Sequence, residues 1–164
     1  LQVERFAVDA DADLKLFGLD KPDTVITVTL KDGPKTLAVG GPVETLGPRI
    51  ARWLKGRALA AFEPATRAMA QAAGLDVTRV AVGDPRARWG SCSSSGAIRY
   101  SWRLAMAPDF VRHAIVAHEV AHLAHMNHGP AFHALADRLG GAEAQGGRQW
   151  LRSHGAALHA VDFG

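Results

Sequence analysis

Two short apolar runs on either side of a turn signal form the first clear pattern of the chain. Residues 25–30 are rich in β-branched side chains, which predicts a strand, and residues 36–39 predict a returning strand. The Lys-Asp-Gly-Pro sequence at residues 31–34 is typical of a turn. We therefore expect a β-hairpin here, and a further short strand at residues 4–8.

A helical pattern follows from about Pro48 to Ala73, where large apolar residues recur at spacings of three, four and seven. Because proline disrupts a helix interior, we expect Pro64 to kink this segment or divide it in two. Gly74 is expected to end it. The apolar face is assigned to the core, and its residues are Ile50, Trp53, Leu54, Ala58, Phe62 and Met69.

The second half of the chain shows strand patterns first and helical patterns afterwards. Residues 77–82 predict a strand, residues 83–96 a glycine-rich loop, and residues 97–102 another strand. Pro108 suits the first turn of a helix that follows it. Two more helices are expected over residues 130–139 and 142–160, with Phe132, Leu135, Leu139, Trp150, Leu151 and Leu158 as core candidates.

This order of elements predicts an α+β protein with a small, mainly antiparallel sheet followed by a central helix and C-terminal helices. No internal repeat and no linker divides the chain, so we expect one compact domain over residues 1–164. Its parts are a hairpin region, a helical segment, a core that carries the candidate chemistry, and a C-terminal helix, over residues 1–45, 46–75, 76–139 and 140–164.

Composition narrows the class of protein further. The chain has 164 residues, 48% of them hydrophobic and 21% charged, which is ordinary for a globular protein. A net charge of +3 is only mildly basic, and no apolar run approaches the roughly 18 residues of a membrane span. A single cysteine, Cys92, excludes an intrachain disulfide framework. We expect a cytoplasmic protein without a membrane partner. Histidine is the one skewed count, and the eight histidines cluster in the last third.

The sequence His118-Glu119-Val120-Ala121-His122 lies in the helix predicted after Pro108. Residues four apart on a helix lie one turn above each other, so His118 and His122 present their imidazoles on one face. Two ring nitrogens at this spacing can share a zinc ion, and Glu119 then lies close to the metal-bound water. The motif therefore predicts a metal-hydrolase active site.

A catalytic zinc ion needs a third protein ligand and leaves a fourth position for water. His128 is the favoured candidate, but it lies six residues past His122 and would face away if the helix continued. The helix must therefore end between Ala124 and Asn127, where the sequence permits a stop. The alternatives for the third ligand are Glu143, His125 and His133.

Such a site predicts a zinc-dependent peptidase that acts on a peptide or protein substrate. Zinc polarises the scissile carbonyl, and Glu119 takes a proton from the water and passes it to the leaving amine. Additional donors must stabilise the oxyanion. The candidates for this role and for substrate binding are Tyr100, Trp102, Arg103 and His125.

The motifs Arg88-Trp89-Gly90-Ser91-Cys92-Ser93, Ile98-Arg99, Trp102-Arg103-Leu104, Ala107-Pro108 and His118-Glu119 through Asn127-His128 together resemble the YgjP-like metallopeptidase domain. The resemblance covers about residues 86–139 and implies a zincin-like fold related to SprT-like and Wss-type zinc proteases. It also implies His118, His122 and His128 as zinc ligands and Glu119 as the base. The strand at residues 98–102 would be the sheet edge beside the cleft, where a peptide adds as an extra strand. His133 departs from the aromatic residue common at that position.

Residues 88–92 admit three interpretations: a loop that supports the active site, a substrate-contacting rim, or a thiol role for Cys92 as fourth ligand or switch. Two other functions stay open beside the peptidase. A non-catalytic zinc-binding module would have a closed site with four ligands. A nucleic-acid-associated adaptor would bind DNA through arginines such as Arg86 and Arg88, and its binding would depend on salt.

Overall fold

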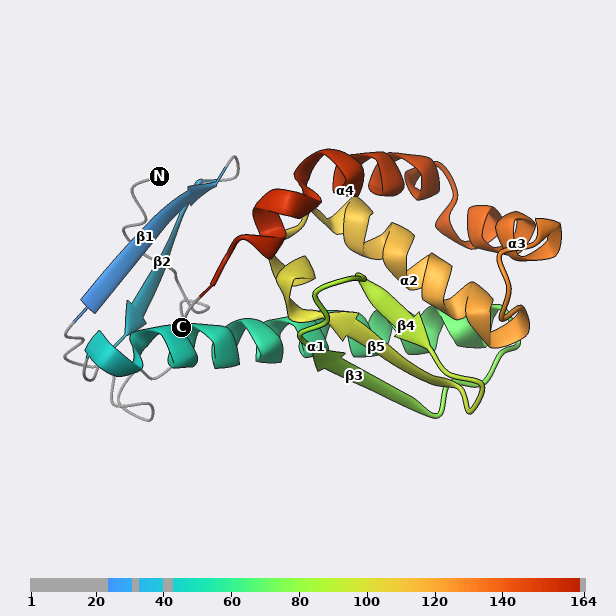
Figure 1. Ribbon diagram of the computed structural model, residues 1–164, viewed down its shortest axis with the longest axis horizontal. Helices are drawn as coiled ribbons and strands as arrows, with labels where there is room; N and C mark the ends of the chain where they lie inside the picture. The colour runs from blue at the N-terminus through green and yellow to red at the C-terminus, as the bar shows by residue number, and fades with distance from the viewer. Residues whose placement is uncertain (1–23, 31–32, 40–42, 163–164) are drawn as a thin grey trace. The chain divides into compact units, whose positions relative to one another are not determined.

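The computed structural model describes residues 24–30, 33–39 and 43–162 (Figure 1). Contacts divide the chain into two units, and the sequence boundary between them falls between Ile50 and Ala51. In the first unit, β1 (Thr24–Leu30) pairs antiparallel with β2 (Gly33–Val39). The predicted hairpin is thereby confirmed. Its residues 31–32 and the strand expected at residues 4–8 lie outside the described residues.

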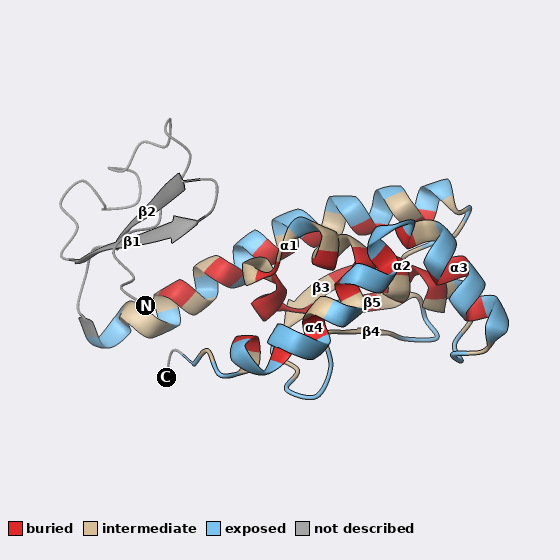
Figure 2. Cartoon of the chain, turned by 90° about the horizontal axis from the view of Figure 1, so that it is seen from above, coloured by how far each residue is buried: buried red, intermediate tan, exposed pale blue. Residues whose placement is uncertain are grey.

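A short 3-10 helix, η2 (Val43–Thr45), leads into the long helix α1 (Leu46–Ala72). The predicted division at Pro64 is wrong, since α1 runs through this residue without a break. Pro64 and Ala60, whose carbonyl lacks its helical donor, are both exposed, so water can replace the lost hydrogen bond. Figure 2 shows the buried stripe of α1, and its residues are Ile50, Leu54, Ala58, Phe62, Thr66 and Ala70.

A three-stranded mixed sheet contains β3 (Arg79–Gly83), β4 (Gly90–Cys92) and β5 (Ala97–Ser101). β5 is the central strand and pairs parallel with β3 and antiparallel with β4. The strand at residues 98–102 is therefore not the sheet edge that the family resemblance implied. β4 is an edge strand, and it was not predicted because it spans three residues inside a glycine- and serine-rich stretch.

Helix α2 (Asp109–Ala124) is the most buried helix of the second unit. It follows the 3-10 helix η3 (Trp102–Met106), and Pro108 caps its start. Figure 1 shows α2 between β4 and the C-terminal helix, and it contacts both of them. Eight of its sixteen residues are buried. A side chain that points out of α2 is therefore surrounded by other elements, which is the condition for a preorganised site.

Two helices complete the second unit, α3 (Pro130–Gly140) and α4 (Glu143–His159). Both were predicted, and of their expected core residues Phe132, Leu135, Leu151 and Leu158 are buried. The predicted α+β class is confirmed by the four α-helices and the small mixed sheet among the described residues. Within the described part of the chain, no helix is both long and apolar enough to cross a membrane.

Candidate metal centre and active site

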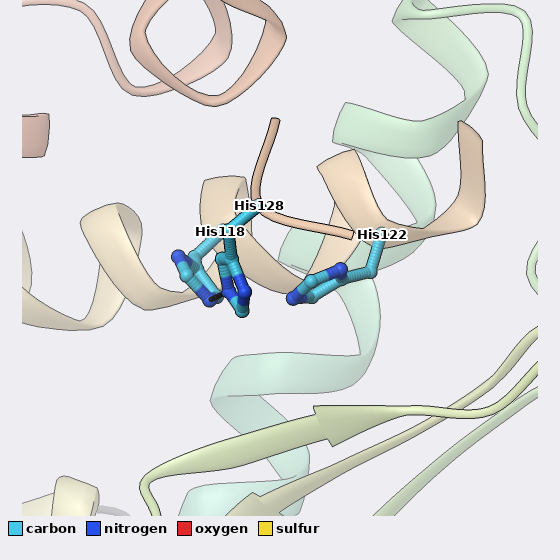
Figure 3. Close-up of side chains that lie close together, drawn as sticks. All are labelled: His118, His122 and His128. Carbon is cyan, nitrogen blue, oxygen red and sulfur yellow. Dashed lines mark hydrogen bonds between the residues drawn. The ribbon is translucent and has the colours of Figure 1, made fainter. Parts of the chain in front are cut away.

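Three histidine side chains converge at the end of α2 (Figure 3). His118 and His122 extend from adjacent turns of the helix, and His128 lies in the connection to α3. The candidate ligand atoms all lie within 4.8 Å of one another, and Nε2 of His118 is 3.2 Å from Nε2 of His128. Two nitrogens that bind one zinc ion tetrahedrally at about 2.0–2.1 Å lie about 3.3 Å apart. The donor set and its spacing therefore fit a metal ion.

The abrupt end of α2 brings His128 to the other two histidines. The last helical residue is Ala124, and His125 has extended backbone angles that turn the chain away from the helix axis. Beyond it, the side chain of Asn127 accepts a hydrogen bond from the backbone N–H of Gly129 at 3.4 Å. The predicted helix end between Ala124 and Asn127 is confirmed. Among the described residues no non-glycine residue has a positive φ, so the turn forms without backbone strain.

The ring of Phe132 packs against all three histidines. Its centroid lies 4.9 Å from that of His118, 4.4 Å from that of His122 and 4.6 Å from that of His128. Phe132 lies on α3 and is 1% exposed, so its ring is closely packed against the histidines. The sequence predicted a core residue here, but the helical period gave no sign that this ring contacts the cluster.

Two of the histidines are suited to metal binding at neutral pH. Burial, with the neighbouring His122 and His128, lowers the pKa of His118 to about 4, and burial also lowers the pKa of His122. Both rings are therefore neutral at pH 7, as a ligand must be. Nδ1 of His122 lies 3.0 Å from the carbonyl oxygen of His125, which can only accept. The ring thus carries its hydrogen on Nδ1 and leaves Nε2 free to coordinate.

Glu119 is a buried carboxyl that follows His118 on α2 and lines the same cleft as the three histidines. Glu119 is 4% exposed, and its Oε2 has no hydrogen-bond partner among the described residues. Burial raises the pKa of Glu119 to about 8, and the charge of Arg88 partly offsets this effect. A buried carboxyl with an unpartnered oxygen is costly for stability, so its position points to chemistry rather than to packing.

A cleft of about 580 Å³ opens over the cluster. Its walls come from β4 and the loop before it, from α2, and from α4. The apolar part of the lining includes Ile115 and Leu151, while the polar groups that face the same space include the three histidines and Glu119. A mostly apolar cleft with a few converging polar groups is typical of a substrate site.

The other candidates for third ligand lie elsewhere. Oε2 of Glu143 is 2.9 Å from Nδ1 of His113, nearer the start of α2. The ring of His133 lies 6.3 Å from the ring of His128, and its nitrogens do not join the ligand group. His125 contributes its backbone carbonyl to His122 and no ring nitrogen to the group. Among the described residues, the only group with metal-ligand spacing is the three histidines.

Three of the four expected substrate contacts are core residues. Tyr100 is stacked on Phe62 at 4.2 Å and hydrogen-bonded to Thr66 at 2.8 Å. Trp102 is 3% exposed, and the buried guanidinium of Arg103 forms an ion pair with Asp84. The structure places all three in the core and not at the cleft, because Tyr100 lies on the buried side of β5 and Trp102 and Arg103 are buried in η3. The side chain of His125 does not line the cleft either.

Cys92 lines the cleft without joining the ligand group. Burial, with the charge of Glu119, raises the pKa of this thiol from 9.0 to about 11. Since the thiolate is the reactive form, alkylation of the metal-free protein at pH 7 should be about 100-fold slower than for an ordinary thiol. We expect the iodoacetamide rate to rise about tenfold per pH unit from pH 7 to 10. The chain unfolded in denaturant is the control, and a plateau below pH 9 in the folded protein would contradict this prediction.

Comparison with known proteins identifies the family of the chain. The searches of curated proteins and of solved structures found no match. A scan against family models matched the YgjP-like, metallopeptidase domain over residues 5–154, which is most of the chain. The match includes the three histidines, Glu119 and the strand β4. The chain therefore belongs to the YgjP-like metallopeptidase domain family.

Proposed function

We propose that this protein is a zinc-dependent peptidase in which His118, His122 and His128 hold the metal and Glu119 is the general base. One observation carries the proposal: three imidazole nitrogens gather within 4.8 Å, in a cleft that is also lined by a buried carboxyl whose Oε2 has no partner among the described residues. A zinc ion bound there would polarise the scissile carbonyl and lower the pKa of an attacking water to about 7.

Glu119 moves the protons in this mechanism. Its carboxylate accepts a proton from the attacking water and later donates it to the amine that leaves. A pKa raised by burial suits this role, since a base that is too acidic would not retain the proton between the two steps. The apolar surroundings also strengthen each electrostatic contact with the reacting groups, because little water screens them.

The edge strand β4 offers a place for the substrate backbone. One side of β4 pairs with β5, and Gly90, Ser91 and Cys92 line the cleft. An unpaired strand edge presents backbone N–H and C=O groups that an extended peptide can satisfy. A peptide that pairs with β4 would cross the cleft next to Glu119, because Gly90 lies against this side chain. In this proposal β4 takes the place of the strand at residues 98–102 as the edge to which a peptide binds.

A purely structural zinc site is less well supported. Structural sites are closed by four protein ligands, and the group found among the described residues has three. The thiol of Cys92 lines the cleft but does not join this group. The three-ligand group beside an open cleft therefore favours hydrolysis over a structural role.

The proposal is tested by hydrolysis of an unfolded protein, followed by mass spectrometry of the products. We expect cleavage by the zinc-loaded chain, loss of cleavage after treatment with a chelator, and recovery when zinc is restored. The absence of cleavage by protein that carries about one zinc ion per chain would reject the peptidase activity.

Metal analysis of matched variants tests the third ligand. We expect His128→Ala to bind much less zinc than the wild-type chain at equal free zinc, because two ligands hold an ion far less tightly than three. Glu143→Ala should bind as much as wild type, since its carboxylate is engaged with His113. The reverse result would make Glu143 the ligand and His128 a bystander.

A further inference from the structure

Three arginines reach the cleft from two of its walls. Arg88 lies in the loop before β4, whereas Arg148 and Arg152 lie on α4, and all three line the cleft. Arg148 and Arg152 are four residues apart, so they lie on one face of the helix, with the buried Leu151 beside them. The cleft that holds the candidate metal centre is therefore bordered by positive charge on the β4 wall and on the α4 wall.

The negative charge available inside the cleft does not balance these arginines. Glu119 is the one carboxyl that lines it among the described residues. No ion pair joins Arg88 or Arg152 to another described residue. Arg148 is paired with Asp137 at 3.0 Å, but their side chains are 38% and 56% exposed, and exposed pairs are weak. All three guanidinium groups thus remain available to an anionic ligand.

Arg88 and Arg148 also lie within electrostatic reach of the reactive groups. The charge of Arg148 contributes to the lowered pKa of His118, and the charge of Arg88 acts on Glu119. A ligand group bound by these side chains would therefore be close to the bond that Glu119 acts on. Arginine presents a rigid fork of donors that matches a carboxylate, and such charge-assisted pairs are about twice as strong as neutral hydrogen bonds.

We propose that Arg88, Arg148 and Arg152 select substrates that carry a carboxylate next to the scissile bond. This inference rests on the proposed peptidase function and specifies its substrate class. The carboxylate has two sources in a peptide, an acidic side chain or the free C-terminus. If the arginines recognise an acidic side chain, the enzyme is an endopeptidase. If they recognise the free C-terminus, the enzyme removes residues from peptide ends.

The test uses four peptides of one parent sequence, which spans a bond cleaved in an unfolded protein or, if none is cleaved, a bond within a segment that binds the zinc-loaded Glu119→Gln chain. Two differ only by Glu or Gln beside this bond, and two differ only by a free or an amidated C-terminus near it. For the wild-type chain we expect kcat/KM to favour one carboxylate-bearing peptide about tenfold over its neutral partner at low salt. The preference should shrink as salt is added, because ions screen exposed charges.

Variants assign this preference to the arginines. In Arg148→Gln/Arg152→Gln and in Arg88→Gln, the ratio of kcat/KM between the paired peptides should fall to about two or less. Arg86→Gln and Arg138→Gln remove exposed arginines that do not line the cleft, and they should retain the wild-type ratio. Asp137→Asn releases Arg148 from its partner and should increase the ratio. A ratio near one in the wild-type chain, or an unchanged ratio in the cleft variants, would overturn the proposal.

A binding measurement separates this proposal from the peptidase function. Fluorescence anisotropy of the same labelled peptides on the zinc-loaded Glu119→Gln chain reports affinity without hydrolysis. We expect tighter binding of the carboxylate-bearing peptides, and equal affinity after the arginine substitutions. If the paired peptides bind with equal affinity while all three arginines are present, selection by the arginines is rejected even if cleavage occurs. Selective binding without cleavage by the wild-type chain would reject the peptidase function and support the selection.

Discussion

Replacing Glu119 with glutamine is expected to lower kcat/KM for peptide hydrolysis about 10³-fold while the protein still binds zinc. Glutamine has almost the same shape as glutamate, so the buried position next to the cluster remains filled. It cannot accept the proton of the attacking water, and general-base catalysis contributes typically 10²–10⁴-fold. Metal binding should persist, because the ligand group consists of the three histidines. Zinc content and steady-state kinetics of the same preparation measure both effects.

Glu143→Gln is the matched control for this substitution. Glu143 is a half-exposed carboxylate beside His113, so its amide variant should have wild-type zinc content and activity. Residual hydrolysis by Glu119→Gln within a few-fold of the wild-type rate would remove Glu119 from the mechanism. Loss of zinc from Glu119→Gln would instead mean that this carboxyl supports the ligand set, and the kinetic loss could not be assigned to proton transfer.

The sequence predicted the parts of the site that depend on one short segment. His118 and His122 meet because they are one helical turn apart, and the end of α2 follows from residues next to it. The position of His128 could then be inferred from the condition that it must reach the other two. Each of these predictions uses only local geometry, so a single sequence is enough to make it.

The parts that were missed depend on contacts between distant segments. Phe132 touches all three histidines because α3 folds back onto α2, and its apolar character signals no more than a core position. The arginines of α4 reach the cleft through the packing of α4 on α2. The incorrect substrate contacts have the same origin, since the alternating pattern of residues 97–102 does not reveal which neighbours a strand has. Tyr100 is in the core because it packs on Phe62 and Thr66 of α1, and these residues are far from it in the sequence. Arg103 is in the core because η3 is buried and its guanidinium pairs with Asp84.

The close contact between Gly90 and Glu119 is another feature that the sequence did not reveal. Substitution of Gly90 is expected to have the second-largest effect on activity. A Cβ atom at this position would lie 2.7 Å from both Cγ and Cδ of Glu119 and closer still to Oε1. Contacts under 3.0 Å essentially do not occur for real Cβ atoms, so either the carboxyl or β4 must move. A displacement of about 1 Å at a reacting group can cost on the order of 10²-fold in rate.

We therefore expect Gly90→Ala to fold, to bind zinc, and to lose about 10²-fold in kcat/KM. Folding should survive because Gly90 is not among the described glycines with positive φ, so alanine can adopt its backbone conformation. Gly56→Ala is the control, since a Cβ there meets no atom within 4 Å, and it should leave activity unchanged.

The Glu119→Ala substitution provides a sharper test of this contact, because alanine has none of the Cγ, Cδ and Oε1 atoms that the added Cβ would meet. If Gly90 acts by leaving room for the carboxyl, the two substitutions must be coupled. The loss in Gly90→Ala/Glu119→Ala should then be clearly smaller than the product of the two separate losses. If the two losses simply multiply, the alanine at position 90 disturbs β4 itself. The loss of activity would then come from the strand edge that binds the substrate and not from the position of the base. Because Gly90 belongs both to this edge and to the wall behind Glu119, the double-mutant cycle is the measurement that separates its two roles.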